Sequence, residues 1–143
     1  MTKDPATIGG RSGAVAVIVE AGRFLVIRRS EHVVAPLGYC FPGGAIEAGE
    51  SEPAALVREI DEELGAAIEP IGRVWESVAP WGVALAWWQA RFVPGTVIVP
   101  NPAEVASIRW CTPEAMADLP GLLESNRLFL EALASGRIRL QVD

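Results

Sequence analysis

The sequence predicts an α+β domain built in layers around a mixed β-sheet. The chain has 143 residues, which suits one domain, and we expect that domain to span residues 1–143. Half of the residues are hydrophobic and 21% are charged, so a core can form without disulfides or a structural metal. Strand-like runs come first, one helix lies in the middle, more strands follow, and helices end the chain. This order favours a layered α+β architecture.

The first two predicted strands form a β-hairpin. Ala14–Val19 and Phe24–Ile27 are apolar runs rich in β-branched residues, and Ala21-Gly22 separates them. Arg29–Cys40 has no steady period and is predicted to be a loop. Phe41–Gly44 is predicted to be a sharp break, because proline removes a backbone donor and glycine permits positive φ.

A helix is predicted over Glu52–Leu64. Ser51 is a suitable N-cap, and Glu52-Pro53 suits a first helical turn. Gly65 is a suitable stop. After this helix we predict three further strands, over Ile71–Val78, Val83–Val93 and Val105–Trp110. Two helices follow them. The first starts at Thr112-Pro113-Glu114, and the second covers Leu122–Ala134 with Gly136 as its stop.

Charge and cysteine content restrict the partners and the compartment. The formal charge is −6, and an acidic surface repels phosphate backbones, so no nucleic-acid partner is expected. Cys40 and Cys111 are too few for a disulfide framework, which favours a reducing compartment. No apolar run resembles a signal peptide or approaches the roughly 20 residues of a membrane span. We therefore expect a cytoplasmic protein with no membrane partner and with a disordered tail at residues 1–12.

Acidic residues concentrate around the central helix. Seven of the 18 acids lie between Gly44 and Ala66. At about 100° per residue, three of them share a helix sector about 100° wide, and Asp61 points elsewhere. Such carboxylates repel one another unless a cation binds, and oxygen-only ligands select Mg²⁺ or Mn²⁺. The alternative is a solvated acidic face without a metal. The three acids are Glu59, Glu62 and Glu63.

The same segment resembles the Nudix box, G-x5-E-x7-R-E-U-x-E-E-x-G-U, where U is a bulky aliphatic residue. Every polar and glycine position matches, and only Ala66 is smaller than the usual final residue. Phe41–Gly44 resembles the usual lead-in to this box, and Glu104–Trp110 resembles a late strand of the family. The resemblance implies an α/β/α sandwich with a mixed sheet. The matching residues are Gly44, Glu50, Arg58-Glu59-Ile60, Glu62-Glu63 and Gly65.

The resemblance also implies roles for single residues. Glu59, Glu62 and Glu63 would bind the metal, and Glu50 would form an ion pair with Arg58 that holds the loop to the helix. The general base differs between family members. Its candidates here, in falling order of preference, are Glu59, Glu63 and the distal Glu104, although Glu104 could equally be a surface strand end.

Binding residues are predicted upstream of the box. Arg28 and Arg29 follow the second strand, where the family often contacts substrate phosphate, and one of the two would face the cleft. Gly43 and Gly44 are predicted to lie at the same binding site. Three aromatic residues could stack on a base, with core packing as the more common role: Tyr39, Trp81 and Trp88.

The resemblance implies hydrolysis of a nucleotide-type small molecule. Nudix hydrolases cleave the pyrophosphate of a nucleoside diphosphate linked to another group, and we favour a nucleoside di- or triphosphate derivative because the chain is short. The alternative is a nucleotide-binding sensor or regulator without turnover. Trp87 and Trp88 are adjacent and would face opposite sides of a strand, which favours a homodimer that covers one of them.

Overall fold

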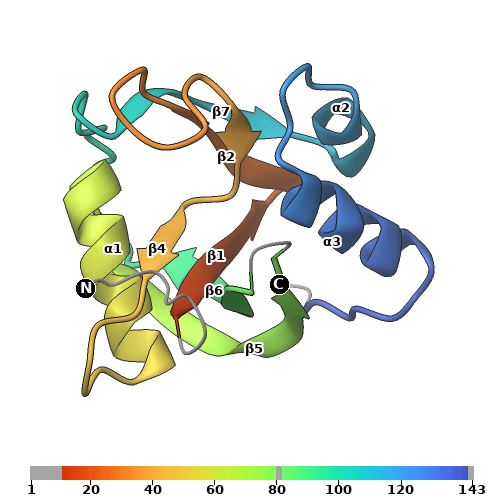
Figure 1. Cartoon of the computed structure of the whole chain (residues 1–143), viewed down its shortest axis with the longest axis horizontal. Helices are drawn as coiled ribbons and strands as arrows, with labels where there is room; N and C mark the ends of the chain where they lie inside the picture. The colour runs from red at the N-terminus through yellow and green to blue at the C-terminus, as the bar shows by residue number, and fades with distance from the viewer. Residues whose placement is uncertain (1–10, 80–81, 142–143) are drawn as a thin grey trace.

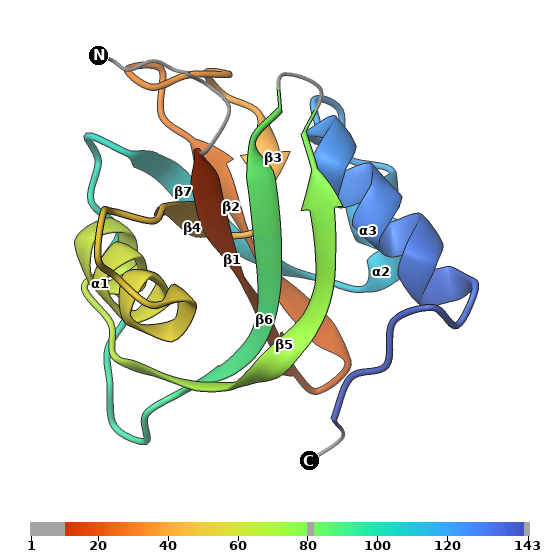
Figure 2. The ribbon, with the colours of Figure 1, turned by 60° about the horizontal axis from the view of Figure 1, so that its bottom comes forward.

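The computed structural model describes residues 11–79 and 82–141, which form a mixed β-sheet between two helical layers (Figures 1 and 2). This architecture confirms the predicted α/β/α sandwich. The elements, in chain order, are β1 Ser12–Glu20, β2 Arg23–Arg29, β3 Tyr39–Cys40, β4 Gly43–Ala45, α1 Glu52–Leu64, β5 Ile68–Val78, β6 Ala84–Phe92, β7 Val105–Cys111, α2 Pro113–Ala117 and α3 Glu124–Ala134.

Strands β1 and β2 form a hairpin whose two strands separate away from the turn. The strands pair only near the turn, where Val19 lies opposite Phe24. Residues 39–45 fill the gap between them, because β3 pairs with β2 and β4 pairs with β1. The prediction of a loop up to Cys40 is therefore wrong at its last two residues, and Gly43-Gly44 is a strand rather than a break. Such short strands owe their conformation to the strands beside them, and local sequence carries little signal for them.

The remaining strands make the sheet mixed. β6 lies parallel to β1, whereas β5 is antiparallel to β6 and β7 is antiparallel to β2. The strand predicted from Ile71 begins earlier, at Ile68, although Pro70 follows. A register shift between Pro70 and Gly72 accommodates the missing proline donor.

The central helix α1 has the predicted ends. The Ser51 hydroxyl accepts the N–H of Ala54 at 3.2 Å. Gly65 adopts φ 60° and donates its N–H to the Asp61 carbonyl at 2.8 Å. These caps explain why the helix starts and stops where the sequence predicts.

Each face of the sheet has its own apolar core. Leu56, Ile60 and Leu64 of α1 pack on one face, and α3 covers the other with Phe129. The second predicted C-terminal helix begins two residues later than expected, at Glu124.

The two adjacent tryptophans face opposite sides of the sheet, as predicted. Trp87 is fully buried and stacks on Phe129, with ring centroids 4.9 Å apart. Trp88 packs against the α1 core and donates its indole N–H to Glu52 at 2.8 Å. The helices of the chain itself therefore contact both tryptophans, so these residues no longer argue for a partner subunit.

The expected tail falls mostly outside the described residues, which begin at Arg11. Ser12, which that expectation included, already belongs to β1. Just before it, the Arg11 carbonyl accepts the N–H of Ala84 at 3.2 Å. Among the helices of residues 11–79 and 82–141, none has the length and apolarity required to span a bilayer.

Candidate active site

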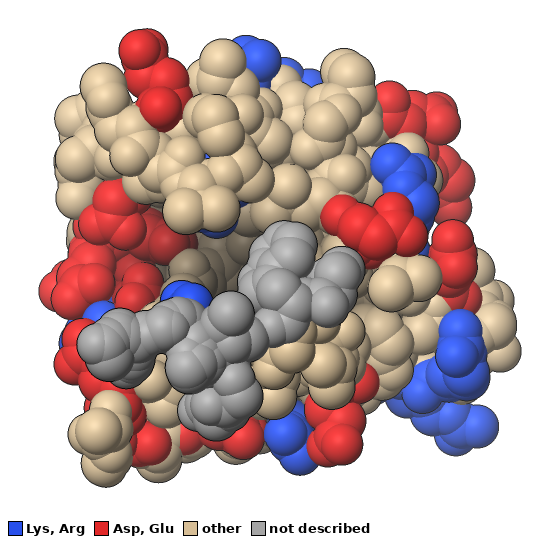
Figure 3. Space-filling model, viewed as in Figure 1, with Lys and Arg blue, Asp and Glu red and all other residues tan. Residues whose placement is uncertain are grey.

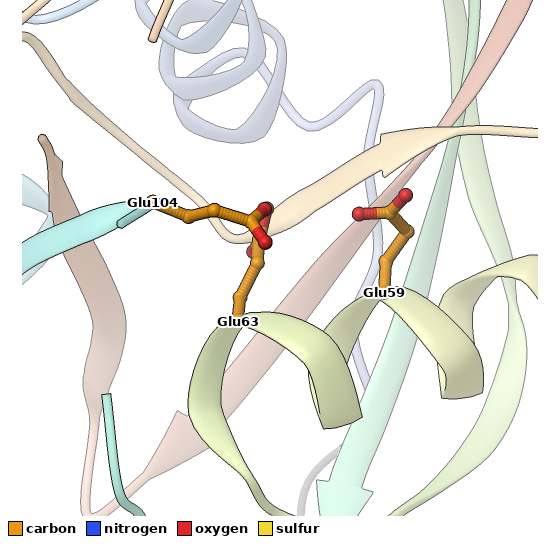
Figure 4. Close-up of side chains that lie close together, drawn as sticks. All are labelled: Glu59, Glu63 and Glu104. Atoms are coloured by element: carbon orange, nitrogen blue, oxygen red, sulfur yellow. The ribbon is translucent and has the colours of Figure 1, made fainter. Parts of the chain in front are cut away.

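Three carboxylates converge between α1 and the start of β7. Glu59 and Glu63 are one turn apart on α1, and Glu104 directly precedes β7. One carboxylate oxygen from each residue lies within 4.8 Å of the other two. Figure 4 shows the two α1 side chains rising from the same side of the helix, with Glu104 reaching toward them.

The glycine pair of β4 makes room for these acids. The Gly43 N–H donates to the Glu63 carboxylate at 3.1 Å. A Cβ at Gly43 would contact the Ala14 carbonyl, and a Cβ at Gly44 would contact the Glu59 carboxylate. The two positions predicted for substrate binding thus also set where the α1 carboxylates lie.

Burial and mutual repulsion disfavour ionisation of the two α1 carboxylates. The Glu63 residue is only 6% exposed. Its burial, together with the nearby Glu59 carboxylate, raises the pKa of Glu63 from 4.5 to about 8. Burial also raises the pKa of Glu59, although Arg58 opposes this effect. A bound cation would reverse both shifts by stabilising the ionised form.

Arg58 connects the acidic loop to α1. Its guanidinium forms a bidentate pair with Glu50 at 2.7 and 2.9 Å, and this hydrogen bonding lowers the pKa of Glu50 to about 2. It also donates to the Ala45 carbonyl at 2.9 Å, to Glu59 at 3.1 Å and to Glu62 at 3.2 Å. The expected Glu50–Arg58 pair is therefore present and joins loop to helix. The Glu62 carboxylate contacts Arg58 and lies outside the three-carboxylate group.

A cleft of about 360 Å³ lies beside the glycine pair. Figure 3 shows acidic side chains gathered over α1 next to a hollow in the same face. Both polar and apolar side chains line the cleft, so it can accept a ligand that is partly apolar and partly charged. Its lining includes Arg29, Phe41, Gly43, Gly44, Leu85 and Asn126.

The two adjacent arginines take different directions. Arg29 lines the cleft, whereas Arg28 stacks over the ring of Tyr39 with its guanidinium carbon 5.4 Å from the ring centroid. Arg109 lies over the same ring at 5.0 Å. Tyr39 is 7% exposed and belongs to the core, as does the packed face of Trp88. The third aromatic candidate, Trp81, lies outside the described residues.

Three polar residues near the site were not singled out from the sequence. The Asn126 side chain accepts the Phe41 N–H at 2.8 Å at the cleft wall. Ser30 and Asn101 both hydrogen-bond to the turn that carries Glu104. Only Asn101 has a sequence signal, because the prolines on both sides of it are typical of a turn.

The donor set fits a hard divalent cation. The group offers only carboxylate oxygens, which Mg²⁺ and Mn²⁺ prefer. The buried Glu63 carboxylate supports this fit, because it needs a positive partner in order to ionise at neutral pH.

Comparison with known proteins identifies the family. The NUDIX domain family matches residues 10–133. A Streptomyces ambofaciens "MutT-like protein" is 30% identical over 124 residues, covering 85% of this chain and 75% of that protein. The crystal structure of a MutT NUDIX hydrolase from Burkholderia pseudomallei is 30% identical, with a TM-score of 0.69, and the match covers 85% of this chain and 95% of that one. The chain therefore belongs to the NUDIX domain family, as its resemblance to the Nudix box predicted.

Longer relatives match over part of their length. The NAD-capped RNA hydrolase NudC of Stutzerimonas stutzeri strain A1501 is 29% identical over 127 residues, which is 89% of this chain and 46% of that protein. The chain thus spans about half the length of such relatives.

Proposed function

We propose that the protein is a metal-dependent hydrolase that cleaves the pyrophosphate linkage of a nucleoside di- or triphosphate derivative. The observation that carries this proposal is the convergence of Glu59, Glu63 and Glu104 within 4.8 Å of one another beside an open cleft. Such a group is unfavourable without a cation, and a pyrophosphate supplies the oxygens that complete a cation's coordination.

Glu59, Glu63 and Glu104 would hold Mg²⁺ or Mn²⁺. A divalent ion bound there would neutralise charge on the phosphates and lower the pKa of the attacking water. Gly43 would keep the buried Glu63 carboxylate oriented through its N–H. Arg58 would fix the acidic loop against α1 through Glu50.

Glu62 remains a proposed ligand. Its side chain is 47% exposed, and its ion pair with Arg58 is a partly exposed contact that contributes at most about 1 kcal/mol. Arg58 would keep its bidentate Glu50 partner if Glu62 turned away. Exchange of Glu62 from Arg58 to a cation therefore costs little.

The proton of the attacking water would pass to one of the site carboxylates. Glu59, Glu63 and Glu104 remain the candidates for this base, because an ionised carboxylate beside the cleft can accept the proton of the attacking water. Arg29 lines the cleft beside Gly43 and Gly44, where its guanidinium would contact a substrate phosphate.

The test is a hydrolysis assay on a substrate panel. The panel holds deoxynucleoside triphosphates, ADP-ribose, NADH, a dinucleoside polyphosphate and, because of the NudC relatives, NAD-capped RNA. We expect nucleotide or phosphate release with Mg²⁺ or Mn²⁺, and none with chelator or in Glu63→Gln. Metal-dependent nucleotide binding without turnover on any member would overturn the proposal in favour of a sensor.

A further inference from the structure

The carbonyls at the end of α1 are capped by a distant segment of the chain. The last carbonyls of a helix have no partner within the helix. Here the Val99 N–H donates to the Leu64 carbonyl at 2.7 Å, and the Asn101 N–H donates to the Glu63 carbonyl at 2.8 Å. The Asn101 side-chain amide also donates to the Glu62 carbonyl at 3.3 Å. This segment is therefore docked on the same helix turn that carries Glu63.

The same asparagine builds the turn that ends at Glu104. Its side-chain oxygen accepts the Ala103 N–H at 3.1 Å, and its carbonyl accepts the N–H groups of Glu104 at 2.9 Å and Val105 at 2.8 Å. Its side-chain amide lies 3.4 Å from the Glu104 carboxylate. On the other side of the turn, Ser30 donates its N–H to the Glu104 carbonyl at 3.0 Å and its hydroxyl to the Ala103 carbonyl at 2.9 Å.

We propose that Asn101 is a positioning residue that sets Glu104 against the two α1 carboxylates. It fixes the helix end with one set of hydrogen bonds and the Glu104 turn with another, so the relative position of the two elements depends on it. This inference rests on the proposed function, in which Glu104 binds the cation.

A neutral amide suits this role. An arginine or lysine at position 101 would hold the Glu104 carboxylate but would also neutralise it and compete with the cation. The amide of Asn101 contacts the carboxylate and leaves its negative charge available. Hydrogen bonds of this kind orient carboxylate ligands, and their loss weakens metal binding.

The test is a titration of the full chain with Mn²⁺, in which electron paramagnetic resonance measures the bound metal. Asn101→Ser keeps a short side-chain oxygen that can accept the Ala103 N–H, but it loses the amide donor. Thr96→Ala is the matched control, because Thr96 accepts the Ala67 N–H at 2.9 Å from the same β6–β7 connection and belongs to neither the site nor the turn. We expect Asn101→Ser to weaken Mn²⁺ binding about 10-fold and Thr96→Ala to leave it unchanged.

A double-mutant comparison separates positioning from a general loss of structure. If Asn101 acts through Glu104, Asn101→Ser adds no further loss of Mn²⁺ affinity in a Glu104→Gln background. An equal loss in both backgrounds, or no loss in the wild-type background, overturns the role of Asn101 and leaves the proposed function intact. If the wild-type chain fails to bind Mn²⁺, or Glu59→Gln and Glu63→Gln bind it normally, both proposals are overturned.

Discussion

Replacing Glu63 with glutamine is expected to stabilise the metal-free protein at neutral pH and to abolish its activity. In the folded chain the pKa of Glu63 is about 8, raised from 4.5 mainly by burial. Above pH 4.5 the unfolded chain therefore releases this proton while the folded chain keeps it. Folding loses stability as pH rises from 4.5 to 8, the loss is absent below that range, and it is constant above it. Glutamine has no proton to lose and retains an oxygen for the Gly43 N–H.

The size of the effect follows from the pKa of Glu63. Each pH unit between the unfolded and folded values costs about 1.4 kcal/mol of unfolding free energy. From pH 5 to pH 7.5 the wild-type chain should thus lose about 3 kcal/mol relative to Glu63→Gln. For a domain of this length that difference corresponds to about 10 °C in Tm.

The assay is urea denaturation of both proteins in chelator at several pH values. Asp61→Asn is the matched control, because Asp61 is exposed and lies two residues away on the same helix. The free energy of unfolding of this variant should change with pH as that of the wild type does. Saturating Mn²⁺ should restore much of the unfolding free energy that the wild type lacks relative to Glu63→Gln, because a cation that binds the folded state stabilises it. A difference between wild type and Glu63→Gln that stays constant from pH 5 to pH 7.5 would refute the reasoning.

Three further variants test the site and its frame. Gly44→Ala should displace the Glu59 carboxylate, which a Cβ would contact, and weaken Mn²⁺ binding in a titration by at least about 10-fold. Arg29→Met should raise KM at least about 10-fold through loss of a charged phosphate contact. Arg91→Met removes the same charge at an exposed position and should leave KM unchanged. Equal effects of the two variants on KM would contradict the proposed placement of the substrate. Ser51→Ala should lower the unfolding free energy by about 1 kcal/mol in denaturant melts through loss of the α1 cap, and an unchanged value would show that the cap contributes nothing.

Local signals predicted the elements that carry their own boundaries. Ser51 and Gly65 fix the ends of α1 by capping, so that helix was predicted to the residue. The positions of β3 and β4 were not predictable in this way. Two- and three-residue strands exist here because β1 and β2 separate and leave backbone groups to be paired, and that separation is a property of the whole sheet.

The site was predictable only to the resolution of helix geometry. The helical phase placed Glu59, Glu62 and Glu63 in one sector, but it could not show that only Glu59 and Glu63 of these three converge with Glu104. Glu104 lies 41 positions beyond Glu63, and only the resemblance to the Nudix family brought it into consideration. The hydrogen bonds from Asn101 to the end of α1 depend on where the β6–β7 connection lies against this helix, which sequence alone does not specify.

Neutral N–H donors contact the centre of the three-carboxylate group, and a positively charged side chain, Arg58, contacts its edge. Gly43 and Asn101 contact Glu63 and Glu104 through N–H groups, whereas the guanidinium of Arg58 reaches only Glu59 among the three converging acids. A second guanidinium at the centre would relieve the repulsion and thereby remove the reason for a divalent cation to bind. The neutral donors of Gly43 and Asn101 instead fix the carboxylates without adding positive charge, and burial continues to disfavour ionisation of Glu63. We therefore expect the proposed metal affinity and the instability of the metal-free protein to have the same origin, so a substitution that stabilises the metal-free protein should weaken metal binding.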